Sequence, residues 1–273
     1  MEEYRDQMGF IQIDKLNISD EIPVKLFDSY SFLYGNQRYF FKTAKNISQI
    51  YNELIAYELA CDFGIESIPY DLAYYHDSSG VISKDCMKKG DKLLEDLLMD
   101  YFHEDYHEKC NLDDTVLTLM ETYGDSCNSI IDELMHMMMF DIIIANHDRH
   151  DRNIIINTET RELGPLMDNE MLGSDQALYD NYYSFKVTSR DENTIANLIK
   201  ILNNDQLLFF YKKVEIISPE NIEDVFRRVE AKIKTSMVVP IKDELRKKFA
   251  FHYRSLLNTL KEELVNRKVL AKK

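Results

Sequence analysis

Short apolar runs broken by turn residues predict strands in the first part of the chain. Phe10–Ile13 is one such run. A stronger signal follows, in which Ser31–Tyr34 and Arg38–Lys42 flank the pair Gly35-Asn36. Two apolar runs separated by such a pair are typical of a β-hairpin. We therefore expect a hairpin whose second strand ends on Lys42, after three aromatic residues.

A helical period replaces this pattern between residues 46 and 64. Apolar residues recur there at helical spacing, namely Ile50, Leu54, Tyr57 and Cys61. Asn46 or Ser48 can cap the first turn, and Gly64 can end the last. Two more strands, Tyr70–Tyr75 and Val81–Ser83, are expected on either side of a turn at residues 77–80.

The remaining chain reads as helical, with one interruption. From Leu93 onward three helices are expected, the last running through Leu134, Met138 and Ile142. Ile154–Ile156 and Leu163–Met167 then predict a hairpin, and helices follow Gly173 to the end. This order predicts an α+β fold with two lobes, a small β-rich N-terminal lobe (residues 1–87) and a larger helical C-terminal lobe (residues 88–273).

Composition narrows the class of protein. The chain has 273 residues, 45% of them hydrophobic, and a net charge of −15, which argues against a general nucleic-acid binder. The four cysteines form no CxxC pair, and the N-terminus does not read as a signal peptide, which predicts a cytoplasmic protein. We expect no membrane contact, because no apolar stretch reaches the roughly 20 residues needed to span a bilayer. Residues 241–273 are locally basic, as in a solvated helix face or a docking patch.

A dense polar cluster, Asn146 to Asn153, separates the two apolar runs 142–145 and 154–156. Such a cluster between buried segments is typical of a rigid functional loop. Asp148, Asn153 five residues later and Asp168 after the expected hairpin follow the order of the catalytic Asp, metal-binding Asn and metal-binding Asp of protein kinases. Carboxylate and amide oxygens suit Mg²⁺, and Asp148 can accept the proton of a substrate hydroxyl.

Lys42 and the helix after it fit the same chemistry. A lysine at the end of a strand is by itself commonly a solvated cation. In kinases, however, a strand lysine binds nucleotide phosphates and pairs with a helix glutamate. Glu53 lies next to the apolar helix positions and is the expected partner, whereas Glu58 points elsewhere on the helix. The segment of residues 83–90 would form the hinge between the lobes, where the backbone of Asp85, Cys86 and Met87 would meet adenine.

These motifs resemble the HipA-like serine/threonine kinases. The resemblance rests on the loop Asn146–Asn153, on Tyr39–Lys42, on residues 52–60 and on Gly80–Asp85, and covers roughly residues 30–175. It implies Mg²⁺ and ATP as cofactors, Asp148 as the catalytic residue and Asn153 and Asp168 as metal ligands. It also implies a protein substrate, and an antitoxin-like partner is a further expectation.

The resemblance gives roles to the remaining site residues. Lys42 would bind phosphate, Glu53 would orient Lys42, and His150 belongs to the nucleotide site or holds the loop by a hydrogen bond. The chain departs from the family in being compact at its N-terminus. It also lacks glycines at residues 25–31, where we place the phosphate loop, and Asn169-Glu170 follows Asp168 in place of the Phe-Gly of other kinases.

Three alternatives stay open at this point. A metal-dependent hydrolase would use His147, Asp148, His150 and Asp151 around zinc or manganese. A pseudokinase or binding module would keep the fold without catalysis. A lipid kinase would find its only support in the basic C-terminal residues.

Overall fold

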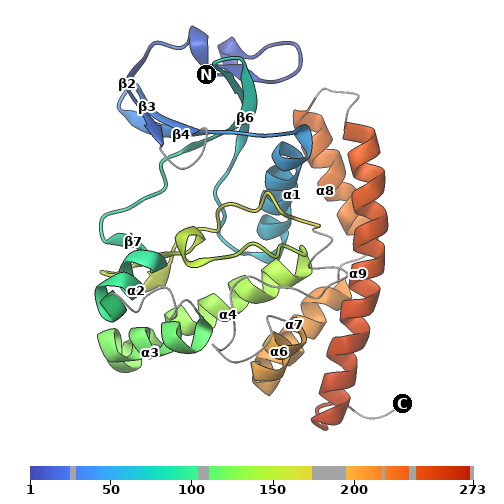
Figure 1. Cartoon of the computed structure of the whole chain (residues 1–273). Helices are drawn as coiled ribbons and strands as arrows, with labels where there is room; N and C mark the ends of the chain where they lie inside the picture. Colours follow the sequence, from blue (N-terminus) through green and yellow to red (C-terminus); the bar gives the residue numbers. More distant parts are fainter. Residues whose placement is uncertain (25–28, 104–110, 174–194, 217–218, 234–237, 271–273) are drawn as a thin grey trace.

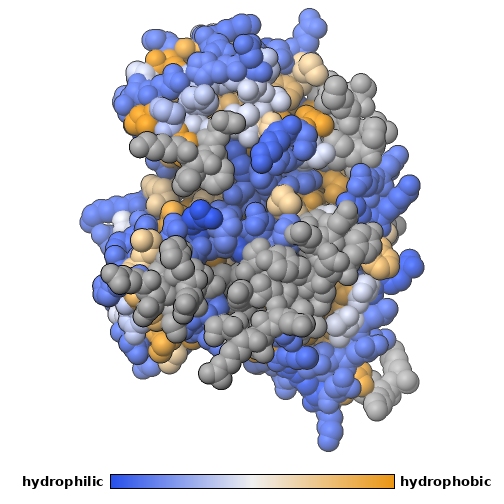
Figure 2. All heavy atoms as spheres, viewed as in Figure 1, coloured by the Kyte–Doolittle hydropathy of each residue, from blue (hydrophilic) through white to orange (hydrophobic). Residues whose placement is uncertain are grey.

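The structure is a computed structural model that describes residues 1–24, 29–103, 111–173, 195–216, 219–233 and 238–270. A β-rich N-terminal lobe sits above a larger helical lobe (Figure 1). The expected α+β class is therefore confirmed. The visible face is mostly hydrophilic, with hydrophobic residues in small scattered groups (Figure 2).

A six-stranded sheet forms the N-terminal lobe, in the order β1-β5-β6-β4-β3-β2. Only the short β1 runs parallel to its neighbour, β5; the other pairs are antiparallel. The strands are β1 (Ile11–Gln12), β2 (Ile18–Val24), β3 (Ser29–Tyr34), β4 (Gln37–Thr43), β5 (Asp71–Tyr75) and β6 (Ser78–Lys84).

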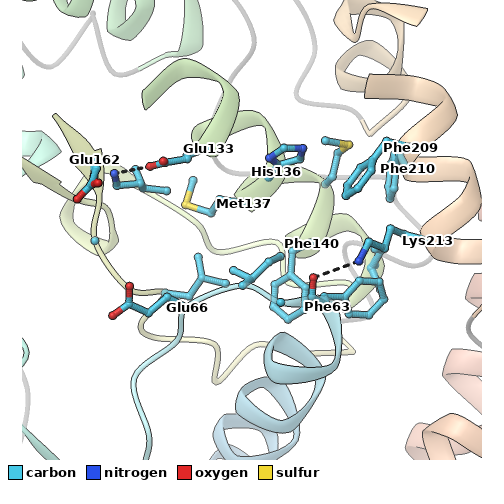
Figure 3. Close-up of a pocket in the computed structure, with 17 residues that line it drawn as sticks. Phe63, Glu66, Glu133, His136, Met137, Phe140, Glu162, Phe209, Phe210 and Lys213 are labelled. Atoms are coloured by element: carbon cyan, nitrogen blue, oxygen red, sulfur yellow. Dashed lines mark hydrogen bonds between the residues drawn. The ribbon is translucent and has the colours of Figure 1, made fainter. Parts of the chain in front are cut away.

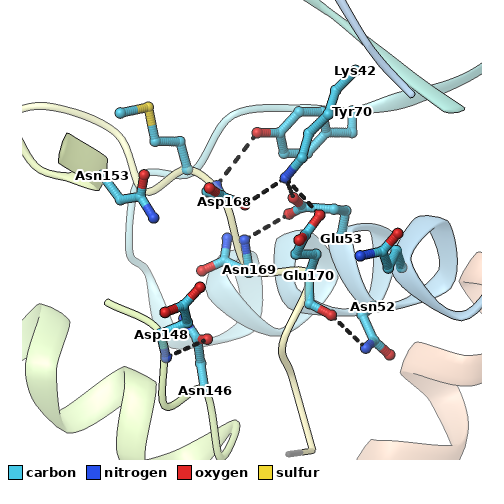
Figure 4. A network of polar contacts seen from close by, with 12 residues as sticks. Lys42, Asn52, Glu53, Tyr70, Asn146, Asp148, Asn153, Asp168, Asn169 and Glu170 are labelled. Atoms are coloured by element: carbon cyan, nitrogen blue, oxygen red, sulfur yellow. Dashed lines mark hydrogen bonds and ion pairs between the residues drawn. The ribbon is translucent and has the colours of Figure 1, made fainter. Parts of the chain in front are cut away.

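The side chains of β4 alternate between the two faces of the sheet, and Lys42 lies on the face opposite Phe41. Phe41 is fully buried in a small core that also contains Phe32 and Ile82. Because successive side chains of a strand point to opposite faces, Lys42 points away from this core. It points instead toward helix α1 (Ile47–Phe63), as Figure 4 shows.

Helix α1 begins and ends where the sequence predicts. The Asn46 side chain accepts a hydrogen bond from the Gln49 amide (3.2 Å), and Gly64 ends the helix in the left-handed conformation that glycine tolerates best. The side of α1 away from the sheet packs on α8 (Pro219–Lys232), where Tyr51 stacks on Phe226.

Ion pairs also attach α8 to α1. Arg228 donates hydrogen bonds of 2.7 Å to both Glu58 and Asp62, and Lys232 lies 2.9 Å from Glu58. Glu58, the weaker candidate for the Lys42 partner, therefore binds α8 instead. The helix that carries Glu53 is held by a segment some 170 residues further along the chain.

A second sheet and the remaining helices complete the structure. Its order is β7-β8-β9, with both pairs antiparallel. Buried side chains of α1 and of the helical lobe form one large hydrophobic core. The further elements are β7 (Asp91–Leu93), α2 (Leu94–Phe102), α3 (Leu112–Tyr123), α4 (Asn128–Ile143), β8 (Ile155–Asn157), β9 (Glu162–Leu163), α6 (Ile195–Ile201), α7 (Asn204–Ile216) and α9 (Val238–Asn266). No helix of the described residues is long and apolar enough to cross a membrane.

Two local predictions were wrong. The turn after β5 involves His76 and Asp77, not residues 77–80, because both adopt positive φ and close a tight hairpin in which Ser78 pairs with Tyr75. Ser29–Ser31 belong to β3, not to a loop, since they pair with residues 40–42 of β4. The rest of the expected phosphate loop, residues 25–28, lies outside the described residues.

Strands β4 and β6 approach each other closely at Gly80, and a substitution there tests this packing. A Cβ added there would lie 2.1 Å from the carbonyl oxygen of Lys42. Gly80→Ala should therefore destabilise the protein by about 1–3 kcal/mol, as overpacking does. Denaturant unfolding would measure this, with Ser79→Ala as the control from the same strand. Equal stability of the two variants would contradict the packing described here.

Candidate active site

Lys42 is the centre of a network of acidic side chains (Figure 4). Its ammonium group lies 3.3 Å from the Glu53 carboxylate and 2.9 Å from that of Glu170, and it also pairs with Asp168. The structure thus brings Lys42 and Glu53 together, as the sequence predicts. It adds Glu170, whose role the sequence did not indicate.

Burial makes these charges interact strongly. Glu53 is 1% exposed, and this burial raises its pKa to about 7, although Lys42 opposes the shift. Burial alone would lower the pKa of Lys42, but Glu53, Asp168 and Glu170 together raise it well above its usual value. Three carboxylates around a single ammonium leave an excess of negative charge, which favours binding of a further cation.

Helix α1 also holds the segment that carries Asp168. The second Glu53 oxygen accepts a hydrogen bond of 2.9 Å from the Asn169 amide. The neighbouring Asn52 side chain donates to the carbonyl oxygens of Glu170 (2.7 Å) and Leu172 (3.2 Å). Adjacent residues of one helix therefore position both the lysine and the acidic segment.

Asp168 has an uncommon backbone conformation. Its φ of 58° lies in the left-handed region, which Asp tolerates better than most residues and which is often found at functional sites. Its amide lies 3.5 Å from the hydroxyl of Tyr70. Burial raises the pKa of Tyr70 well above its usual value, so the hydroxyl stays protonated.

Arg149 joins the polar loop to the Asp168 segment. Its side chain is fully buried and makes two hydrogen bonds of 2.9 Å to Asp141, in the last turn of α4. It also donates to the carbonyl oxygens of Asn153 (3.3 Å) and Met167 (2.6 Å) and to the Asn169 side chain (2.7 Å). One guanidinium thus fixes the helix end, the loop and the residues on both sides of Asp168.

Asp148 and Asn153 both belong to this loop. In Figure 4 both side chains lie on the side of Asp168 that faces away from Lys42. The Asp148 amide lies 3.4 Å from the Asn146 side-chain oxygen. The Asn153 amide group lies 3.2 Å from Nε2 of His150. Burial lowers the pKa of His150, so its neutral ring can accept that hydrogen bond.

Two backbone amides of the expected hinge already make hydrogen bonds within the chain. The Asp85 amide donates to the Arg38 carbonyl oxygen (2.9 Å), and the Met87 amide donates to the Asp85 side chain (3.0 Å). Cys86 is half-buried between them, and the Met87 side chain is exposed. Contact of this segment with adenine stays a prediction.

The metal-ligand geometry favours one region of the site. Within the described residues, one group of three acidic, His or Cys side chains could share a metal ion: Glu53, Asp168 and Glu170, with ligand atoms within 4.8 Å of one another. Asp168 was expected in a metal site, whereas Glu53 and Glu170 were not. The set His147, Asp148, His150 and Asp151 does not form such a group, which removes the geometric support for the hydrolase alternative.

Sequence reasoning missed several residues that hold the site together. Arg149 had no assigned role, although Asp141 within an apolar helix signals a buried charge that needs a partner. Asn169 and Glu170 were noted only as a departure from other kinases. The contacts of Asn52 and Tyr70 span about 100 residues or more, and no local pattern indicates them.

Comparison with known proteins identifies the class of fold. No family model and no curated protein matches this sequence. The crystal structure of the Helicobacter pylori proinflammatory kinase CtkA matches 92% of this chain and 97% of its own, with a TM-score of 0.70 and 15% identity. The kinase-like, two-lobed fold expected from the sequence is therefore confirmed.

Two further structures match with lower scores. One is the CtTel1 dimer, with a TM-score of 0.49, 13% identity, and coverage of 87% of this chain and 11% of the other. The other is the Shewanella oneidensis MR-1 complex of HipA, HipB and operator DNA, with a TM-score of 0.36, 13% identity, and coverage of 84% and 59%.

Replacing Arg149 should show how much of the site depends on it. Arg149→Met leaves Asp141 buried without its cation and should cost about 3–5 kcal/mol of unfolding free energy. The double variant Arg149→Met/Asp141→Leu removes both charges and should recover part of this loss. Denaturant unfolding of the three proteins measures both effects. A cost below about 1 kcal/mol for the single variant would show that the loop is held by other contacts.

The raised pKa of Glu53 predicts a pH dependence of stability. A carboxyl group with a higher pKa in the folded state ionises first in the unfolded state. Its contribution to stability is therefore lost as the pH rises from about 4.5 to about 7. The stability of the natural protein relative to Glu53→Gln should fall over this range.

Glu58→Gln is the matched control on the same helix. Lys232 and Arg228 lower the pKa of Glu58 although burial opposes them, so it is ionised throughout the range above pH 5. Its stability difference should stay nearly constant with pH. Thermal melts at half-unit steps would test both, and parallel curves for the two variants would contradict the raised pKa of Glu53.

Proposed function

We propose that this protein is an ATP-dependent phosphotransferase that transfers phosphate to serine or threonine residues of a protein. The observation that carries the proposal is the network around Lys42. It joins a strand lysine, a buried helix glutamate and Asp168 in a chain whose fold is that of a kinase. Phosphoryl transfer depends mainly on such positioning and charge neutralisation.

The residues present suit a divalent cation with a nucleotide. Asp168 and Asn153 would hold Mg²⁺, because their oxygen atoms are the hard ligands this ion prefers, and Glu170 adds a nearby carboxylate. Bound Mg²⁺ would supply neutralisation of phosphate charge. Lys42 would then exchange its pairs with Asp168 and Glu170 for phosphate oxygens, while Glu53 keeps it in place.

The hollow next to Lys42 agrees with this exchange of partners. It has a volume of only about 10 Å³, with Glu170, Gln49 and Val81 among its lining residues. A phosphate group bound in this hollow would therefore have to displace Glu170. The backbone of Asp85, Cys86 and Met87 would hold the adenine. His150 would orient the Asn153 side chain through the contact between them.

Asp148 has the role of catalytic base in this proposal. Its carboxylate would accept the proton of the acceptor hydroxyl as the oxygen forms its new bond to phosphorus, and ADP would leave with the electrons of the broken bond. The loop positions Asp148 rigidly because Arg149, the next residue, is anchored to α4. A protein substrate and an antitoxin-like partner are further parts of the proposal that rest on the sequence resemblance.

Two aspartate variants separate catalysis from metal binding. Asp148→Asn should lower phosphate transfer by about 10²-fold or more and leave Mg·ATP binding intact. Asp168→Asn should weaken Mg²⁺-dependent ATP binding itself. Transfer of labelled γ-phosphate to the protein itself or to a cell lysate measures the first effect, and calorimetry measures the second.

Asp77→Asn is the control for these variants. It lies in an exposed turn whose positive φ asparagine also tolerates, so both activities should stay normal. Normal transfer in Asp148→Asn would overturn the role of this loop. ATP binding without any transfer in the natural protein would favour the pseudokinase alternative.

A further inference from the structure

A second pocket is lined by residues of the helical lobe and of the end of α1 (Figure 3). It has a volume of about 530 Å³, within the range of roughly 300–1,000 Å³ typical of small-molecule sites. Its walls come from α4, α7, β9 and the end of α1. None of the residues with a role in the proposed kinase site lines it.

Most of the pocket surface is aromatic or aliphatic. Phe63 and Phe140 meet edge to face, with ring centroids 5.9 Å apart. Phe210 and Met137 are buried in the wall, while Phe209 is 43% exposed at its edge and lies against His136. Such a surface suits a ligand with an apolar body.

One end of the pocket has a single positive charge. The Lys213 ammonium lies 5.7 Å from the ring centroid of Phe63 and 5.4 Å from that of Phe209. Its hydrogen bond goes to the carbonyl oxygen of Phe63, at 3.2 Å. Within the described residues, no carboxylate forms an ion pair with it. Its charge is thus available to an anion.

The opposite end of the pocket is acidic. Glu133, Glu162 and Glu66 lie there, far from Lys213 in Figure 3, and the Glu66 carboxylate lies 3.9 Å from the Lys88 ammonium. Glu133 accepts a hydrogen bond of 2.6 Å from the Leu163 amide, which fixes its carboxylate at the wall. An anionic group would be repelled from this end and attracted to the end with Lys213. The charges therefore set the orientation of a bound anionic ligand.

We propose that this pocket binds an amphipathic monoanion of the medium-chain fatty acid type. The carboxylate would pair with Lys213, and the alkyl chain would lie along the accessible rings of Phe63 and Phe209, with Phe140 and Met137 behind them. The proposal is independent of phosphotransfer, because it rests on the pocket alone.

A fluorescent reporter makes the binding measurable. The chain contains no Trp, so Phe209→Trp would introduce a single one at the edge of the pocket. Decanoate, below its micelle concentration, should change this fluorescence in a saturable way. Decanol, which is neutral, and decyltrimethylammonium, which is positive, should bind at least tenfold more weakly. Equilibrium dialysis of labelled decanoate with the natural protein should give the same affinity, which excludes an effect of the reporter.

Variants of Lys213 test the charge that orients the ligand. Lys213→Met keeps the apolar stem over the two rings and should weaken decanoate binding at least tenfold, whereas Lys213→Arg should retain it. Lys212→Gln, an exposed neighbour on α7, should bind like the natural protein. Circular dichroism melts would verify that each variant is folded. If Lys213→Met does not fold, the preference of the natural protein for decanoate over decyltrimethylammonium still tests the charge requirement.

Several results would overturn the proposal. Absence of saturable decanoate binding to the natural protein would do so, as would equal affinity for decanoate and decyltrimethylammonium. Unchanged affinity in a folded Lys213→Met would show that the ammonium does not bind the carboxylate.

Discussion

The buried pair of Arg149 and Asp141 is the contact on which the candidate site depends most. Removing two charges from water is costly, and the cost is offset here because Arg149 makes five hydrogen bonds to groups of three segments. Those segments carry or flank Asp148, Asn153 and Asp168. Loop backbone that would otherwise be free to move is thereby fixed against the end of a buried helix, and the acidic groups of the site are held at defined positions before any ligand arrives.

The network around Lys42, unlike the pair of Arg149 and Asp141, is not balanced in charge. Its groups repel as well as attract, since three carboxylates share one ammonium, and Glu53 is kept there by α1 rather than by favourable charge alone. A site of this kind gains stability when a cation or a phosphate group rearranges the pairs. The proposed phosphate transfer rests on these two features, the rigid support from Arg149 and the incompletely balanced cluster beside it.

Much of this could be predicted from the sequence, because the relevant patterns are local. Three features depend on neighbouring residues and could be predicted: the hairpin that carries Lys42, the caps of α1, and the spacing of Asp148 and Asn153. Strand β4 itself runs one residue past the predicted end, to Thr43. Other contacts depend on chain segments that meet only in the folded protein, so no local pattern predicts them. They are those of Arg149 with Asn169, of Asn52 with Glu170 and of Tyr70 with Asp168. The turn at His76-Asp77 was misplaced because its positive φ values carry no glycine signal, and the pocket at Lys213 is built from four elements whose apolar residues read as ordinary core.

The attachment of α1 to α8 has a consequence for how the protein matures during synthesis. Arg228 and Phe226 lie about 170 residues after their partners on α1, so α1 emerges from the ribosome long before the helix that supports it. Contacts of such long range form late. Until α8 is made, the nascent chain has the lysine strand and the glutamate helix but not the helix that packs against α1. The proposed nucleotide site would thus be completed only after α8 has emerged.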